Sequence, residues 1–167
     1  MREVTNWDKY HQRVQVSQRF LWTIWRAYDG LMHDISFNRP IKIVELGCGT
    51  GYHTLQMTKL YPVTKVTLVD FNADVIEDTE RRMAGLRCEK EFLLRDLFDL
   101  ELGEKYDIVH SQGLLEKLHL WIYPDETAIS REEFAAALES NGLEILKMKG
   151  CHFIELGAVC RRSVKRG

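Results

Sequence analysis

Short apolar runs alternate with longer amphipathic segments along the first two-thirds of the chain. The runs are rich in β-branched residues and are bounded by glycine or polar positions, which is the pattern of strands. They occupy residues 41–46, 65–70, 91–96 and 106–111. Between the first three runs, residues 52–60 and 73–86 show the spacing of apolar positions that is typical of helices. This alternation predicts βαβ units, and hence a parallel sheet with helices on both faces.

Both ends of the chain add further elements. Between residues 7 and 32, apolar and aromatic side chains recur at spacings of three and four, which predicts a helix. A late helix is predicted over residues 130–142, where a serine begins the pattern as a cap and a glycine ends it. Residues 143–149 and 153–161 then predict two strands that lie close enough in sequence to pair antiparallel.

We therefore expect one compact α/β domain with a Rossmann-like, doubly wound architecture. Its sheet would be mostly parallel, with an antiparallel last strand. A helical cover over residues 1–40 would precede the ligand-binding domain of residues 41–167. The length of 167 residues agrees with a single domain.

The composition limits the kinds of partner that the protein is expected to bind and the cellular compartment in which it is expected to occur. The net charge of −2 shows no basic surplus, so nucleic acid is not indicated as a partner. No apolar run is long enough to cross a membrane, and the first residues do not have the pattern of a leader peptide. The four cysteines include no C-x-x-C pair, so we expect no metal site. These features favour a reduced, cytoplasmic protein.

Acids and glycines gather where the predicted strands end. The first strand leads through Glu45 into a loop with three glycines, and the next two strands end in Asp70 and Asp96. The carboxyl ends of parallel strands share one edge of the sheet, where ligands of such folds bind. Glycines let backbone N–H groups approach a ligand, and the following helix N-terminus favours a carboxylate. An acid at the tip of the second strand suits ribose hydroxyls. The sequence thus predicts a nucleoside ligand that also carries a carboxylate.

Four segments in order carry a resemblance to a known family. They read VELGCGTG at residues 44–51, VTLVDFN at 66–72, LLRDLFDL at 93–100 and YDIVHSQGLLE at 106–116. Taken together, they resemble the successive motifs of class I S-adenosylmethionine-dependent methyltransferases. The resemblance runs from about residue 41 to residue 117, and the late helix and strand are similar too.

The resemblance implies a role for each matching residue toward S-adenosylmethionine and its product S-adenosylhomocysteine. Gly47, Cys48, Gly49 and Gly51 would form the turn around the methionine part, with Glu45 near its amino group. Asp70 would bind both ribose hydroxyls. Phe71 and Leu97 would enclose the adenine, and Asp96 would accept a hydrogen bond from its exocyclic amine. Ser111 and Gln112 would line the methionine side, and Trp7 and Tyr10 of the helical cover could touch the ligand.

The implied reaction, methyl transfer from a sulfonium, needs little acid–base chemistry. Holding donor and acceptor in line can supply ~7–11 kcal/mol of the barrier. A base is needed only where the acceptor loses a proton as it attacks. His110 and Glu116 are weak candidates for that base, because a histidine at a strand end more often packs in the wall of the site and Glu116 has the pattern of a solvated helix acid.

The sequence departs from the family after the fourth strand. Only 16 residues separate Gly113 from Ser130, whereas a crossover and a fifth strand need more. Either HLWIY at residues 119–123 is a minimal fifth strand, or the segment is absent. An absence would mean a shortened protein, or a sequence that joins residues on either side of a missing stretch. We favour the last possibility and expect a spatial break between about residues 116 and 120.

Three functions remain open at this point. The first is methyl transfer, with a small-molecule acceptor favoured over a protein or RNA acceptor. The second is a module that binds S-adenosylmethionine or S-adenosylhomocysteine without catalysis. The third is a nicotinamide-dependent oxidoreductase, against which the spacing argues, because Tyr52 occupies the place of the third glycine in that fingerprint.

Overall fold

The computed structural model describes residues 25–26, 29–111, 131–140, 143–151 and 155–162. The chain forms two compact units, of which one comprises residues 6–15 and 36–114 and the other the remaining residues. Among the described residues, no helix combines the length and the apolar character that a membrane span requires.

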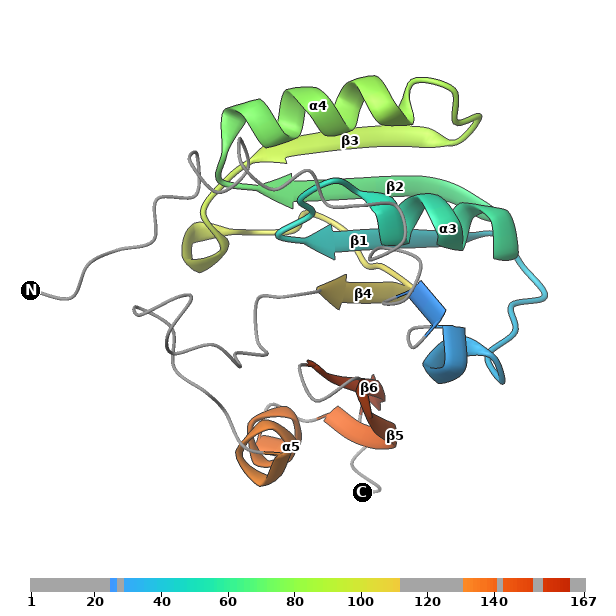
Figure 1. Ribbon diagram of the computed structural model, residues 1–167, viewed down its shortest axis with the longest axis vertical. Coiled ribbons are helices and arrows are strands. Elements are labelled where there is room, and N and C mark those ends of the chain that lie inside the picture. Colours follow the sequence, from blue (N-terminus) through green and yellow to red (C-terminus); the bar gives the residue numbers. More distant parts are fainter. Residues whose placement is uncertain (1–24, 27–28, 112–130, 141–142, 152–154, 163–167) are drawn as a thin grey trace, which may run out of the picture. The chain divides into compact units, whose positions relative to one another are not determined.

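A parallel sheet of four strands is the centre of the first unit. The strands are β1 (Ile41–Leu46), β2 (Val63–Asp70), β3 (Glu89–Leu94) and β4 (Ile108–Ser111). They lie in the order β3-β2-β1-β4, and every neighbouring pair is parallel. The chain therefore moves outward from β1 to β3 and then returns to the other side of β1, as Figure 1 shows. This reversal is the doubly wound topology, and it places a switch point between β1 and β4.

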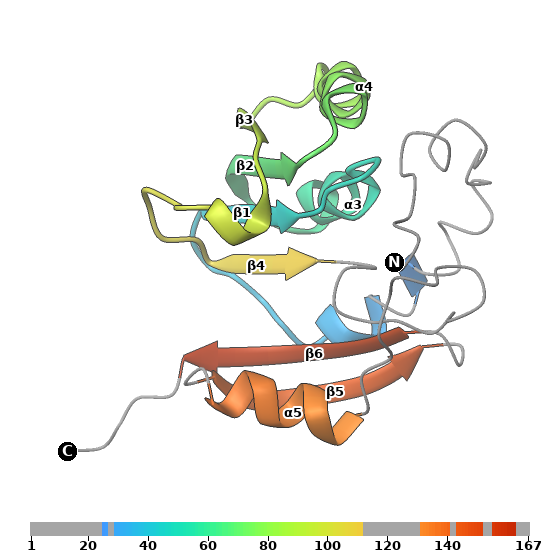
Figure 2. The same cartoon turned by 90° about the vertical axis from the view of Figure 1, so that its left-hand side faces the viewer.

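Two helices, α3 (Tyr52–Leu60) and α4 (Ala73–Met83), make the first two crossovers. Both lie on the same side of the sheet (Figure 2), because both crossovers run in the same direction and are right-handed. The crossover from β3 to β4 differs from the expected pattern. It contains the 3-10 helix η1 (Leu97–Asp99) followed by an extended stretch.

Apolar burial explains why the central strands form. Five of the six residues in the last part of β2, from Lys65 to Asp70, are buried, and β1 is buried at four of its six positions. Such near-continuous burial is typical of parallel strands that are covered on both faces. The side chains of Val66 and Leu68 pack with Met83 of α4, and all three are fully buried.

Local capping sets the start of α4. The side chain of Asn72 accepts hydrogen bonds from the backbone N–H groups of Asp74 (2.9 Å) and Val75 (3.3 Å). Ion pairs between residues four apart, such as Arg82 with Asp78, cover its outer face. The helix ends at Met83, three residues earlier than the sequence pattern predicts.

The second unit contains α5 (Arg131–Ser140) and an antiparallel pair of strands. These strands, β5 (Leu143–Cys151) and β6 (Glu155–Arg162), confirm the predicted antiparallel pairing of the last two strands. Within this unit, Nζ of Lys147 donates to the carbonyl oxygen of Gly30 (2.9 Å) and forms an ion pair with Asp34 (3.2 Å).

Most of the predicted strand and helix positions are confirmed within a few residues. Strand β3 ends at Leu94 rather than at residue 96, so Asp96 follows the strand instead of ending it. The strand stops there because its neighbour β2 ends at Asp70, which pairs with Leu94. Residues 25–26 and 29–32 are helical, whereas most of the predicted cover over residues 1–40 lies outside the described residues. The predicted spatial break between residues 116 and 120 also lies outside them.

Candidate functional site

The loop between β1 and α3 is held in a tight turn by its own backbone. The N–H of Cys48 donates to Val69 of β2 (2.9 Å), and the N–H of Gly51 donates to the carbonyl of Cys48 (2.8 Å). Gly47, Gly49 and Gly51 all have positive φ angles, of 63°, 50° and 63°. Residues with a Cβ rarely adopt such angles, so the turn depends on glycine.

Two of these glycines face different surroundings. A Cβ at Gly51 would lie only 2.6 Å from Cε of Met83 and 2.9 Å from Cγ2 of Thr79. Gly51 therefore lets the loop pack against α4. A Cβ at Gly49 would meet no atom within 4 Å. Gly49 thus presents its bare backbone to open space, where a ligand could approach it closely.

Asp70 at the end of β2 is bound to the same loop. Its Oδ2 accepts a hydrogen bond from the N–H of Gly49 (3.1 Å), and its Oδ1 accepts one from the N–H of Asn72 (3.0 Å). On the other side of the loop, the hydroxyl of Thr79 donates to the carbonyl of Gly49 (2.6 Å). Asp70 as a whole is 6% exposed. Each oxygen of its carboxylate keeps a further lone pair for a ligand hydroxyl.

Phe71 follows Asp70 and is the most exposed large apolar side chain among those described, at 60%. Asp96 is exposed in the stretch after β3, and Leu97 is half-buried at the start of η1. The N–H of Arg95 donates to the carbonyl of Asp70 (2.9 Å), so this stretch leaves the sheet beside the end of β2. An aromatic ring open to solvent beside an acid is suited to stack on a flat heterocycle.

A buried polar cluster lies beneath the glycine loop. Strands β1 and β4 pair so that Glu45 stands opposite His110, and Thr54 of α3 reaches both side chains. The Thr54 hydroxyl lies 2.6 Å from Oε2 of Glu45 and 3.0 Å from Nε2 of His110. All three residues are buried, with exposed fractions of 2% for Glu45, 0% for Thr54 and 7% for His110.

Burial shifts the protonation equilibria in this cluster toward neutral forms. It raises the pKa of Glu45 to about 8, against the lowering effect of the hydrogen bonds from Thr54, and the charge of Asp70 adds to the rise. Burial lowers the pKa of His110 to about 3 and that of the neighbouring His53 to about 4. It also raises the pKa of the Cys48 thiol, with the charges of Glu45 and Asp70 adding to the effect.

The structure brings most of the predicted site residues to one edge of the sheet. Ser111 ends β4, beside the end of β1, and is half-buried. Four further residues of the prediction lie outside the described residues: Trp7, Tyr10, Gln112 and Glu116.

Three polar residues at this edge were missed from the sequence: Thr54, Asn72 and Thr79. Asn72 could have been found as the polar residue before a helix, since that position favours a cap. Thr54 and Thr79 lie inside helices, and no local signal marks a threonine that contacts a distant loop.

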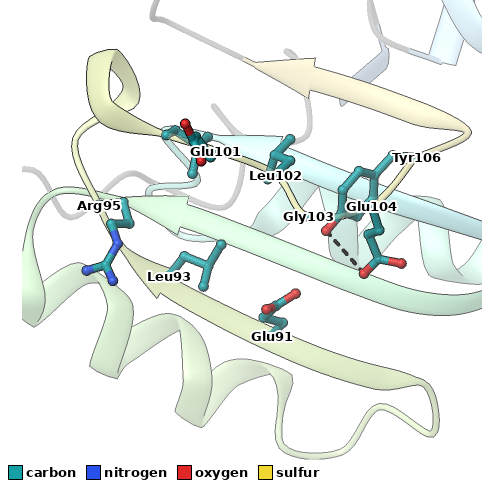
Figure 3. A pocket seen from close by; sticks show the side chains of 9 residues that line it. Glu91, Leu93, Arg95, Glu101, Leu102, Gly103, Glu104 and Tyr106 are labelled. Atoms are coloured by element: carbon teal, nitrogen blue, oxygen red, sulfur yellow. Dashed lines mark hydrogen bonds between the residues drawn. The ribbon is translucent and has the colours of Figure 1, made fainter.

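A separate cavity of about 320 Å³ lies between β3 and the extended stretch that leads to β4 (Figure 3). It contains none of the predicted site residues. Its lining includes Glu91, Arg95, Glu104 and Tyr106, and the Tyr106 hydroxyl donates to Glu104 (3.5 Å). Two of the lining residues, Glu91 and Glu104, form ion pairs with Lys65.

The ammonium group of Lys65 joins three carboxylates. Its Nζ lies 2.6 Å from Glu104, 2.9 Å from Glu91 and 3.0 Å from Glu89. The hydrogen bonds that the ammonium group donates to these carboxylates raise the pKa of Lys65, and the bond to Glu104 has the largest effect. In turn, Lys42 and Lys65 lower the pKa of Glu104 to about 2. Mutual pairing of the charged groups explains the cluster without a ligand.

Comparison with known proteins shows the family of the chain. A family model described as "Methyltransferase domain" matches residues 43–142. Among curated proteins, a malonyl-[acyl-carrier protein] O-methyltransferase from Bacillus anthracis is 31% identical over 115 residues, which cover 68% of this chain and 39% of that protein. A second one, from Bacillus cereus, is 37% identical over 83 residues, which cover 47% of this chain and 29% of that protein. The chain therefore spans well under half the length of these relatives.

A solved structure shares the fold at low identity. The magnesium protoporphyrin IX methyltransferase from Synechocystis, determined with bound S-adenosylmethionine, superposes with a TM-score of 0.59 at 15% identity. The match covers 93% of this chain and 89% of that chain. At such identity the likeness concerns the fold alone.

Proposed function

The chain belongs to the methyltransferase-domain family and has the fold of class I S-adenosylmethionine-dependent methyltransferases, and we propose that it transfers a methyl group from S-adenosylmethionine to a small-molecule acceptor. The hydrogen bond from Gly49 to Asp70 (3.1 Å) carries the proposal. It joins the glycine loop and the acid of β2 into one cradle at the carboxyl ends of the strands, where ligands of this topology bind.

The residues present fit a nucleoside that carries an amino acid. Open space at Gly49 leaves room for the ligand beside the loop, and Asp70 can accept bonds from ribose hydroxyls. The exposed ring of Phe71 would cover one face of the adenine, with Leu97 on the other and Asp96 near its amine. Glu45 would face the amino group of the amino acid.

The remaining proposed contacts complete the methionine side. They are Gly47, Cys48, Gly51 and Ser111, together with Gln112, Trp7 and Tyr10 outside the described residues. The first turn of α3 contains no acidic side chain, and the partial positive charge at the N-terminus of this helix would favour the ligand's carboxylate.

Bound S-adenosylmethionine would supply a sulfonium methyl group that is already activated for displacement. The work of the protein is then to hold the donor, to align the acceptor and to exclude water. His110 is buried against Thr54 with a lowered pKa, so we propose it as a positioning residue rather than as the base.

The proposal favours a small molecule as acceptor for two reasons. The net charge of −2 offers no surplus for a nucleic-acid backbone. The relatives from Bacillus anthracis and Bacillus cereus are named for a malonyl group on an acyl-carrier protein. A malonyl thioester is therefore the first acceptor to test, in a panel with other small carboxylic acids.

Calorimetric titration with S-adenosylhomocysteine tests the cradle. We expect micromolar binding to the wild-type chain and no measurable binding to Asp70→Ala. Asp74→Ala is the matched control, because Asp74 is an exposed acid in the first turn of α4. Circular dichroism must show that Asp70→Ala is folded, since the substitution also removes the acceptor for the N–H groups of Gly49 and Asn72. Wild-type protein that binds no S-adenosylhomocysteine contradicts the proposal.

A second candidate is a module that binds the nucleoside without transferring its methyl group. The short interval between Gly113 and Ser130 favours it, because the family usually builds its acceptor side there. Formation of S-adenosylhomocysteine from S-adenosylmethionine with the acceptor panel separates the two. Binding without turnover on every acceptor would favour the module.

A further inference from the structure

We infer that Thr79 of α4 is a positioning residue, which holds the Gly49 peptide in the conformation that the amino-acid part of the ligand requires. It would thereby favour S-adenosylhomocysteine over nucleosides that lack the amino acid. Thr79 is fully buried, so it acts through Gly49 and not by touching the ligand. The inference rests on the proposed function, because it takes the glycine loop to surround the methionine part of the ligand.

The hydroxyl of Thr79 bonds to the glycine loop and not to its own helix. A threonine inside a helix commonly donates to a carbonyl oxygen of the preceding turn. Thr79 instead donates to the carbonyl of Gly49 (2.6 Å), which lies 30 residues earlier in the sequence. A buried donor of α4 therefore holds a segment that belongs to the end of β1.

Two further contacts join the Thr79 side chain to the same loop. A Cβ at Gly51 would lie 2.9 Å from Cγ2 of Thr79, so the methyl group packs closely on this glycine. The side chain also forms a hydrogen bond with the thiol of Cys48. Because both substituents of its Cβ contact the loop, the threonine is held in one rotamer, with its hydroxyl directed at Gly49.

Gly49 is held on both sides of its Cα atom. Its N–H donates to Oδ2 of Asp70 (3.1 Å), and its carbonyl accepts from Thr79 (2.6 Å). Each peptide group is planar, so the two bonds fix the φ and ψ angles between them. Without the Thr79 bond only the N–H side is anchored, and the peptide after Gly49 can rotate, since glycine has wide conformational freedom.

The position of Thr79 separates the two parts of the proposed ligand. The nucleoside would be held by Asp70 and Phe71, and Asp70 is anchored independently by the N–H of Asn72 (3.0 Å). The amino-acid part would lie against the loop, where the Gly49 peptide depends on Thr79. Loss of the Thr79 hydroxyl should therefore weaken the binding of the amino-acid part far more than that of the nucleoside.

Calorimetric titration of Thr79→Val with two ligands tests this separation. 5′-Methylthioadenosine has the same nucleoside as S-adenosylhomocysteine but no amino acid. Valine keeps the branched shape and removes the hydroxyl, so the ligand must then order the Gly49 peptide as it binds. We expect S-adenosylhomocysteine to bind about tenfold more weakly, from the entropy of ordering one residue. 5′-Methylthioadenosine should bind nearly as it does to the wild type.

Two variants control for a purely structural effect. Thr79→Ser loses the methyl group and keeps the hydroxyl, so it should lower the melting temperature but retain most of the preference for S-adenosylhomocysteine. Thr67→Val makes the same exchange at another fully buried threonine, whose hydroxyl lies 3.1 Å from Glu91 and 2.9 Å from Tyr106. Thr67→Val should leave the ratio of the two affinities unchanged.

Hydrogen exchange measured by NMR tests the positioning role in the unliganded protein. The Gly49 amide should exchange about tenfold faster in Thr79→Val than in the wild type, because this residue loses one of its two anchors. The N–H of Arg95 donates to the carbonyl of Asp70 at the same edge of the sheet (2.9 Å) and serves as the internal control. It should exchange at the wild-type rate.

The outcomes separate the inference from the proposed function. Wild-type protein that binds no S-adenosylhomocysteine overturns the proposed function, and the exchange of the Gly49 amide still decides whether Thr79 positions the loop. An unchanged ratio of the two affinities in Thr79→Val overturns the inference alone. The inference is also overturned if Thr79→Ser loses the preference as fully as Thr79→Val, or if the Gly49 and Arg95 amides accelerate equally.

Discussion

The backbone N–H of Gly49 donates a hydrogen bond of 3.1 Å to the carboxylate of Asp70. The donor lies in the loop after β1, and the acceptor ends β2, so the bond ties together the two features that the sequence marks most clearly. Gly49 is also held from its carbonyl side by Thr79 of α4 (2.6 Å). The loop is therefore shaped by the sheet and the helix before any ligand binds.

Alanine at Gly49 should mainly weaken ligand binding, whereas alanine at Gly51 should mainly reduce stability. At Gly49 the new methyl group meets open space, and only the positive φ is unfavourable, so we expect a stability loss of about 1 kcal/mol. The same methyl group would occupy the ligand's approach, so S-adenosylhomocysteine binding should weaken at least tenfold. Chemical denaturation and calorimetric titration measure the two effects.

At Gly51 the methyl group would lie 2.6 Å from Met83, and the backbone strain adds to this overlap. We expect Gly51→Ala to lose more than about 2 kcal/mol of stability. A Gly51→Ala protein as stable as Gly49→Ala would contradict the packing role that we assign to Gly51.

Phe71→Ala should weaken the binding of S-adenosylhomocysteine about tenfold, since stacking of a base on an aromatic ring contributes about 1–3 kcal/mol. The ring is 60% exposed, so its removal should change the free energy of unfolding little. Leu60→Ala is the matched control, because Leu60 is 53% exposed at the far end of α3. Equal affinity of Phe71→Ala and Leu60→Ala would remove Phe71 from the site.

The buried cluster should make stability depend on pH in two directions. The pKa of Glu45 is raised from 4.5 to about 8, so its stabilising contribution is complete below pH 4.5 and is lost as the pH rises toward 8. The pKa values of His53 and His110 are lowered from 6.5, so their contributions are complete above pH 6.5 and are lost as the pH falls toward 4 and 3. The unliganded protein should be most stable close to pH 6.5.

Urea denaturation across pH 5–9 tests this dependence. Glu45→Gln should remove the decline in the free energy of unfolding between about pH 6.5 and pH 8. Glu77→Gln, on the exposed face of α4, should keep the decline. A decline that persists in Glu45→Gln would assign it to another group.

Lys65→Met should lower the melting temperature, because it leaves the carboxylates of Glu89, Glu91 and Glu104 facing one another. Lys59→Met is the control, since Lys59 is exposed at the end of α3 and donates a hydrogen bond to the side chain of Gln56, one turn earlier in the same helix. Differential scanning calorimetry compares the two variants. Equal melting temperatures would show that the cluster beside the cavity contributes nothing to stability.

The local sequence pattern was sufficient to predict strand β1, helix α3 and the loop between them. The predicted bounds of β1 and α3 are confirmed, and the glycines of the loop have the positive φ angles that a tight turn requires. The reason is that strand burial, helix periodicity and the conformational freedom of glycine act over a few neighbouring residues.

The elements between β3 and β4 were less predictable. No periodic pattern distinguishes the 3-10 helix η1 and its extended continuation from other irregular chain. The sequence pattern predicted Asp96 at the end of a strand, whereas in the structure it lies in the stretch after β3. The reason is that the end of β3 depends on where β2 ends. Strand ends are set by the neighbouring strand, which lies far away in sequence.

Only the tertiary structure shows that Glu45, Thr54 and His110 lie in contact. His110 follows Glu45 by 65 residues, and their adjacency results from the register in which β4 pairs with β1. Thr54 joins them because α3 packs on that part of the sheet with its polar side chain inward. Strand register and helix packing are decided by burial of the whole core, so residues in sequence order cannot reveal which buried side chains lie within hydrogen-bond distance of one another.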